Sequence, residues 1–201
     1  MDILKVLEDN INERHIDAAV NALENNELII YPTDTVYALG CNALNNSAIN
    51  KLCKLKGINT NKTNLSIICD SISMAAEYAH FDNRQFKMLK VNTPGPFTFI
   101  FPASSTLPKA FKGRKTVGIR IPDNKIALEL VKKFGGPILT TTIEFEDEDY
   151  AINPELIAER YDGEVQCLLD GGDGGMIPST VVDCCNKEIE IIREGKGELI
   201  I

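Results

Sequence analysis

Residues 28–41 read Leu-Ile-Ile-Tyr-Pro-Thr-Asp-Thr-Val-Tyr-Ala-Leu-Gly-Cys, and the fold is organised around this stretch. The apolar run that opens it predicts a buried strand over 28–31, which Pro32 ends because proline has no backbone N–H to donate. Polar groups then crowd into five residues: Thr33, Asp34, Thr35 and Tyr37. Ligands of α/β proteins bind at the carboxyl ends of strands, where these side chains would project. The same pattern is equally typical of a turn in which hydroxyl and carboxylate groups bond to their own backbone.

The composition is that of a globular protein with one sizeable core. Of the 201 residues, 44% are hydrophobic and 25% are charged, so we expect one domain over 1–201 with a core at about 15–197. No apolar run approaches the roughly 20 residues that a membrane helix needs, and the start does not resemble a signal peptide. We therefore expect a cytoplasmic protein. The six cysteines include no Cys-x-x-Cys pair, so we expect reduced, mostly buried thiols and no zinc site.

The charges are unevenly spread along a chain whose net charge is −8. Segments 51–62 and 109–120 hold nine of the 21 basic residues and no acid, whereas 144–149 is almost wholly acidic. Folded together, the basic segments would form a positive cleft that attracts anions such as nucleotide phosphates. The alternative is that they are solvated surface segments.

Hydrophobic periodicity predicts helices and strands that intermingle without strict alternation. Helices are expected near 16–23, 47–56, 71–78, 83–90, 126–134 and 154–161, the second of them capped by Ser47 and ended by Gly57. Further strands are expected at 65–69, 97–102, 116–121, 137–140, 165–169, 180–184 and 188–193. This order favours a single α/β domain with a large twisted mixed β-sheet flanked by helices.

Hydroxyl groups near predicted strand ends are the main chemical signal. They belong to Thr33, Thr35, Ser66, Thr98, residues 140–142, Ser179 and Thr180. Together with Lys56, Arg120 and Arg193 they could line one anion pocket. The glycine-rich stretch 171–175 indicates either a phosphate contact or a flexible turn. His15 and His80 lie in or beside predicted helices and give no compelling Ser-His-Asp or Cys-His arrangement, so the sequence disfavours covalent catalysis and favours positioning and charge stabilisation.

Five motifs together resemble the YrdC-domain family. They are residues 31–40, 93–98, 117–122, 178–183 and 192–195, which occur in the family's order, and their details look closest to the YciO branch. The resemblance implies a twisted α/β sheet with a concave, positively charged face. It also implies synthesis of threonylcarbamoyl-AMP from L-threonine, bicarbonate and ATP, with release of diphosphate and with Mg²⁺ assisting. That adenylate serves the modification of an adenosine in certain tRNAs.

The resemblance also assigns roles to particular positions. Threonine would be held by Thr33, Thr35, Tyr37, Arg120 and Thr142. The nucleotide would be held by Lys56, Thr98, Thr140, Ser179 and Arg193. No residue is assigned as a covalent or acid–base catalyst, and no metal ligand is assigned.

Three positions depart from the pattern of the family's synthases. Ile58 and Glu144 stand where the synthases carry arginine and asparagine, and a pocket histidine corresponds to about Ile68. An isoleucine replaces neither the charge nor the five donors of a guanidinium.

Three functions therefore compete. The retained polar residues favour a threonylcarbamoyl-AMP synthase or an adenylate-forming enzyme for a related acid. The lost arginine favours that second enzyme or a non-catalytic protein that binds double-stranded RNA or tRNA. The sequence predicts neither the oligomeric state nor any partner protein.

Overall fold

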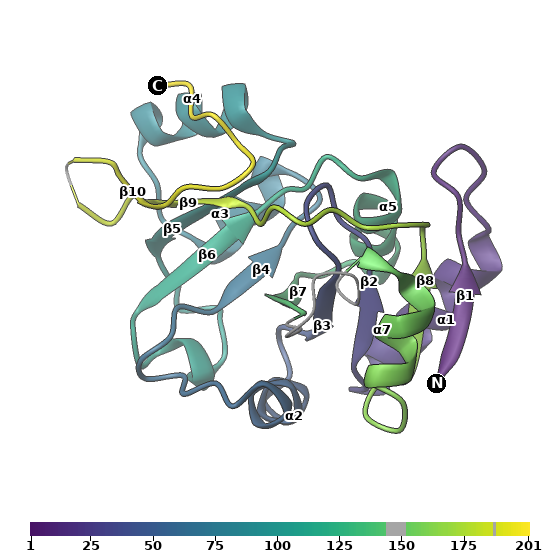
Figure 1. Cartoon of the computed structure of the whole chain (residues 1–201). Coiled ribbons are helices and arrows are strands. Elements are labelled where there is room, and N and C mark those ends of the chain that lie inside the picture. Colours follow the sequence, from purple (N-terminus) through teal and green to yellow (C-terminus); the bar gives the residue numbers. More distant parts are fainter. Residues whose placement is uncertain (144–151, 187) are drawn as a thin grey trace.

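One mixed sheet of ten strands runs through the part of the protein that the structure describes (Figure 1). The computed structural model describes residues 1–143, 152–186 and 188–201. In spatial order the strands are β1 (Asp2–Lys5), β8 (Cys167–Asp170), β2 (Ile29–Tyr31), β3 (Ala38–Asn42), β7 (Ile138–Thr142), β4 (Ser66–Ile68), β6 (Thr116–Arg120), β5 (Phe97–Pro102), β9 (Thr180–Asp183) and β10 (Glu190–Arg193). The pairs β1–β8, β2–β8, β4–β6 and β5–β9 are parallel, and the remaining pairs are antiparallel. The expected single α/β domain with a large mixed sheet is confirmed.

Helices flank this sheet, and most of them begin and end where the sequence predicts. They are α1 (Glu13–Glu24), α2 (Asn46–Lys56), α3 (Ile72–Tyr78), α4 (Asn83–Asn92), α5 (Lys125–Phe134) and α7 (Pro154–Arg160), with a 3-10 turn η1 (Lys109–Phe111). One cap was predicted wrongly. Asn45, not Ser47, caps α2, because the Asn45 side chain accepts from the N–H groups of Ser47 and Ala48 at 2.8 and 3.1 Å. Gly57 ends that helix in the left-handed region, as expected. None of the described helices is long and apolar enough to cross a membrane.

Two strands, β1 and β3, were not predicted. β3 directly follows the polar turn, and four of its five residues are buried, so it shows no alternation of polar and apolar side chains. Gly40 within it is required by packing, since a Cβ there would lie 2.7 Å from the Tyr31 ring. β7 pairs with all of β3 and therefore reaches Thr142, two residues beyond its predicted end.

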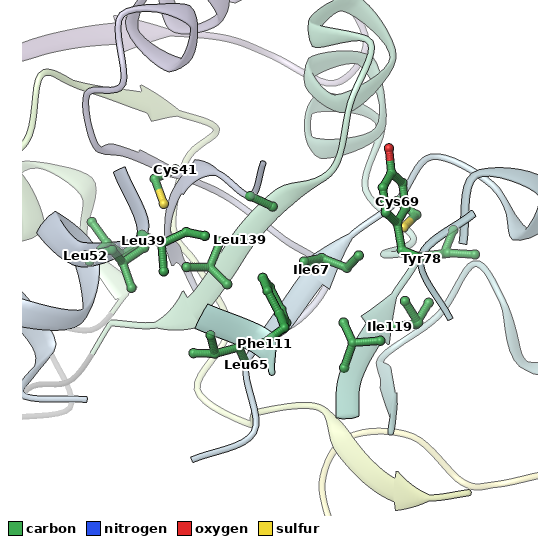
Figure 2. Close-up of a cluster of buried hydrophobic side chains, with 14 of the residues drawn as sticks. Leu39, Cys41, Leu52, Leu65, Ile67, Cys69, Tyr78, Phe111, Ile119 and Leu139 are labelled. Carbon is green, nitrogen blue, oxygen red and sulfur yellow. The ribbon is translucent and has the colours of Figure 1, made fainter. Parts of the chain in front are cut away.

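Two hydrophobic clusters are buried against the sheet. The larger one packs α2, α3, α4 and η1 against the central strands, and Figure 2 shows its centre around Leu39, Ile67, Phe111 and Leu139. The other packs α1 and α5 against β2 and β8, and it also contains Ile68. All six cysteines are free, as expected, and all except the half-buried Cys185 are buried.

The hydroxyl of Thr180 fastens the C-terminal segment to β9. It donates to the Gly197 carbonyl at 2.7 Å and accepts from the N–H groups of Gly195 and Gly197, each at 3.1 Å. The side chain is fully buried, so water cannot replace these bonds. Arg193 and its neighbours depend on this anchor for their position.

We expect Thr180→Val to lower the free energy of unfolding by about 2 kcal/mol, because it leaves buried N–H and C=O groups without partners. Urea unfolding followed by circular dichroism would measure the loss. Thr180→Ser retains the hydroxyl and should recover much of the stability. If Thr180→Val is as stable as Thr180→Ser, the hydroxyl does not anchor this segment.

Candidate functional site

A cavity of about 350 Å³ opens over the strands β7, β4, β6, β5 and β9, which lie side by side. The strand register aligns Ser66 with Gly118 on one side and with Thr140 on the other. Gly118 has no room for a side chain, because a Cβ there would collide with the Ser66 hydroxyl and lie 3.0 Å from Thr98. Small residues thus keep the floor of the cavity open, and its volume is in the range of small-molecule sites.

Arg120 lines this cavity from the last position of β6. One terminal nitrogen, Nη2, donates to the hydroxyls of Thr33 and Thr35 at 2.9 and 2.5 Å and to Asp34 Oδ1 at 2.7 Å. Arg120 and Asp34 are 6% and 7% exposed, so this is a buried ion pair. The Nε–H of Arg120 is also buried and has no partner among the described residues.

The Thr33–Thr35 turn has features of both predictions made from its sequence, a self-bonded turn and part of a binding site. Its hydroxyls bond to each other at 3.1 Å, and that of Thr33 donates to the Val36 carbonyl at 2.7 Å, as in a self-bonded turn. The same two hydroxyls hold Arg120. They do not line the 350 Å³ cavity; they line a second hollow of about 720 Å³ together with Asp34.

Arg193 and Ser179 form the other polar side of the cavity. The Nε and Nη2 atoms of Arg193 donate to the Ser179 carbonyl at 3.2 and 2.8 Å, and Nη2 also donates to the Ser179 hydroxyl at 3.2 Å. The Ser179 hydroxyl lies 2.9 Å from that of Thr98. Burial, and then the positive charge of Arg120, lower the pKa of Arg193 below its ordinary value. Two cations therefore approach one cavity, an arrangement that an anion would stabilise.

A β-bulge in β10 aims Arg193 and its neighbour Ile192 at the same cavity. Ile191 pairs with Val182 and Arg193 pairs with Val181, which leaves Ile192 unpaired between them. Successive side chains of a regular strand point to opposite faces, but a bulge redirects them. Both Ile192 and Arg193 consequently line the cavity; the sequence predicted Arg193 there but neither Ile192 nor the bulge.

Six of the ten predicted site residues line the cavity: Thr98, Arg120, Thr140, Thr142, Ser179 and Arg193. Thr33 and Thr35 reach it through Arg120. Lys56 lies in the last turn of α2 and is not among the lining residues. Asp34, which the sequence analysis assigned to neither ligand, is the missed member of the cluster. The sequence signal that could have identified Asp34 is its position between Thr33 and Thr35 in the motif 31–40.

Tyr37 lies outside the cavity. Its side chain is fully buried, and its hydroxyl donates to the Gly172 carbonyl at 2.7 Å and accepts from the Gly171 N–H at 3.1 Å. Tyr37 thereby holds the glycine-rich segment 171–175 against the Thr33–Thr35 turn. A Cβ at Gly175 would collide with the Thr35 carbonyl, so this glycine permits a close approach of two backbones.

The described residues do not fit a resident Mg²⁺ ion. Nowhere in 1–143, 152–186 and 188–201 do three or more His, Cys, Asp or Glu side chains gather as a metal site. Every described residue that lines the cavity lacks a carboxylate, the ligand that Mg²⁺ prefers. Glu144, one of the positions that depart from the synthase pattern, lies outside the described residues.

The two basic segments lie next to each other at one side of the cavity. α2 contacts η1, and Arg114 donates to the Asn64 side chain at 3.1 Å and to the Lys62 carbonyl at 3.3 Å. Asn64 itself lines the cavity. We call residues 51–62 and 109–115, which are these two basic segments without the part of the second that forms β6, the basic rim. Lys51 within it is paired with Glu27 at 2.8 Å.

The fold and the cavity define an α/β protein with a cavity between two arginines. A family model named for Sua5, YciO and YrdC, with the description "Telomere recombination", matches residues 21–195. The chain belongs to this Sua5/YciO/YrdC family, as its motifs predicted.

Three relatives illustrate the similarity. The crystal structure of Escherichia coli YciO has a TM-score of 0.91 and 32% identity, with 98% of both chains covered. Sua5 of Pyrococcus abyssi, solved in complex with L-threonine, has a TM-score of 0.88 and 30% identity, with 97% of this chain and 58% of that one covered. Threonylcarbamoyl-AMP synthase of Bacillus subtilis is 30% identical over 187 residues, which are 92% of this chain and 54% of the synthase. The chain thus spans little more than half the length of these last two proteins.

Proposed function

We propose that this protein binds L-threonine and an adenine nucleotide in the cavity between Arg120 and Arg193 and catalyses the reaction of a threonylcarbamoyl-AMP synthase. The observation that carries the proposal is the convergence of two guanidinium groups, each held by hydroxyl groups, on one cavity of about 350 Å³. The similarity to a threonylcarbamoyl-AMP synthase and to a protein solved with L-threonine supports the choice of substrates.

The chemistry requires positioning and neutralisation of charge. Bicarbonate condenses with the amine of threonine to give a carbamate and water. A carbamate oxygen then attacks the α-phosphorus of ATP, the bond from that phosphorus to the bridging oxygen of the β-phosphate breaks, and diphosphate leaves. We assign Arg120 to the threonine carboxylate and Arg193, with Ser179 and Thr98, to the α-phosphate. Fixed donors directed at developing charge are sufficient for such a reaction without a covalent intermediate.

We expect diphosphate release from ATP and bicarbonate to depend on threonine. A coupled diphosphate assay, run with and without threonine, measures this directly. Arg193→Ala should abolish threonine-dependent release, because the α-phosphate loses its cation. Arg84→Ala should leave it unchanged, because Arg84 is an exposed residue of α4 outside the cavity. Absence of threonine-dependent release in the unmodified protein would refute the synthase proposal.

The basic rim favours a second candidate function, binding of tRNA or double-stranded RNA. Seven of its cations are exposed on adjoining segments: Lys51, which is paired with Glu27, and Lys54, Lys62, Lys109, Lys112, Arg114 and Lys115. Polyanions release counterions when they bind such a surface, so affinity should fall steeply as salt increases. Salt-dependent RNA binding that weakens in a Lys109→Glu/Lys112→Glu variant, combined with no diphosphate release, would favour this function over the first.

A further inference from the structure

The charge of the cavity limits which nucleotide it can hold. Among the described residues that line it, Arg120 and Arg193 are the only charged ones. Asp34 already balances Arg120 at 2.7 Å, whereas Arg193 donates to the neutral carbonyl and hydroxyl of Ser179. The described site therefore offers one uncompensated cation and one guanidinium with an unused donor.

The remaining lining residues carry no charge. Part of the wall is apolar and consists of Leu52, Ile58, Leu65, Ile100, Leu139, Val181 and Ile192. The rest of it is formed by hydroxyl and amide side chains. Such a surface suits a nucleoside and a single phosphate, since an anion desolvated against aliphatic carbon is unfavourable.

Ile58 holds a fixed place in this wall. Its N–H donates to the Cys53 carbonyl at 2.8 Å, which is the six-residue bond that closes a helix after a left-handed glycine. The side chain is half-buried and packs against the larger hydrophobic cluster. The chain therefore presents an apolar group at a rigid position of the cavity.

The two arginines of the cavity, Arg120 and Arg193, are equal in number to the two anionic groups of an acyl adenylate. An adenylate of an amino-acid derivative carries one negative charge on its phosphate and one on its carboxylate, whereas a triphosphate carries about four on its phosphates alone. The described lining has no carboxylate to hold Mg²⁺, and beyond its two arginines it offers no counter-charge to the surplus charge of a triphosphate, since the cations of the basic rim lie outside that lining.

We propose that the cavity is matched in charge to a nucleoside monophosphate and its acyl adenylates, and that it binds AMP more tightly than ADP or ATP. This inference rests on the proposed function, which locates the nucleotide in this cavity. In the proposed reaction, the adenylate would be held more firmly than the ATP from which it forms.

Titration calorimetry with AMP, ADP and ATP, each in EDTA and again with Mg²⁺, tests the inference. We expect the affinity for AMP to exceed that for ATP at least tenfold in both conditions. Ile58→Arg adds a cation at the rigid wall position and should narrow or reverse this difference. Ile58→Met, which adds no charge, should preserve the preference for AMP.

The outcomes separate this inference from the proposed function. If ATP binds as tightly as AMP, with or without Mg²⁺, the charge-matching inference is wrong, although the synthase proposal stands. If neither nucleotide binds, the location of the nucleotide is wrong and both proposals fall. If Ile58→Met shifts the preference as much as Ile58→Arg does, charge at this position is not the cause.

Discussion

Replacing Arg120 by alanine is expected to lower the free energy of unfolding by about 3–5 kcal/mol, because it strands a buried carboxylate. Asp34 is 7% exposed, and Arg120 is its ion-pair partner among the described residues. Among the described residues, the other donor to the Asp34 carboxylate is the Asp123 N–H, at 3.1 Å from Oδ2, while the Lys196 ammonium donates to the Asp34 backbone carbonyl at 2.6 Å. Urea unfolding at pH 7 would measure the difference. A cost below about 1 kcal/mol would show that the pair is not buried as described.

A double variant separates the structural role of Arg120 from its role in binding. Asp34→Asn combined with Arg120→Met leaves no buried charge and should recover much of the stability lost by Arg120→Ala. The double variant should nevertheless fail to bind threonine in calorimetry, since the guanidinium is gone. If it both folds and binds threonine like the unmodified protein, Arg120 does not hold the threonine carboxylate.

Stability is expected to fall steeply above about pH 8.5, because buried thiols resist ionisation. Cys41, Cys69 and Cys167 are at most 2% exposed, and burial raises the pKa of each above its ordinary value. In the unfolded chain these thiols ionise near pH 8.5, while in the folded protein they remain protonated. The unfolded state then binds fewer protons, so the free energy of unfolding decreases as pH rises and is unaffected by these groups at lower pH.

The expected slope is on the order of 1.4 kcal/mol per pH unit for each thiol, or about 4 kcal/mol per unit for the three. Urea unfolding between pH 7 and 10 in reducing buffer would test this. Cys69→Ala should reduce the slope of unfolding free energy against pH above pH 8.5 by about 1.4 kcal/mol per unit, the contribution of one thiol. This holds whatever the substitution does to stability at pH 7. A free energy of unfolding that stays constant from pH 8 to 10 would contradict the prediction.

Most helices and strands could be predicted because their signals are local. The i, i+4 spacing of apolar residues in α5, Asn124 at its start and Gly135 at its end are readable from twelve consecutive residues. β3 was not predicted because burial on both faces removes the alternation of polar and apolar residues that marks a strand. Asn45 was not predicted as the cap of α2 because the two residues that follow it, Asn46 and Ser47, are also good capping residues.

The site was predicted in part, for a related reason. Hydroxyl and guanidinium groups at strand ends were visible, and those on β4, β5, β6, β7 and β10, together with Ser179 just before β9, do line one cavity. Tyr37 had the same appearance in the sequence, yet its hydroxyl is turned to the glycine-rich segment. The direction of a side chain after a strand depends on what packs against the turn, which is not a local property.

By itself the sequence determined where β2 stops, which residues are apolar enough to be buried, and which motifs define the family. Pro32 ends β2 because it lacks a donor, and that consequence needs no tertiary structure. Only the tertiary structure decided that Arg120 is paired with Asp34, 86 residues away, that Gly118 keeps the cavity floor open, and that a bulge directs Arg193 inward. These features depend on strand register and close packing between distant segments, and both are set by the whole sheet rather than by any single stretch of the chain.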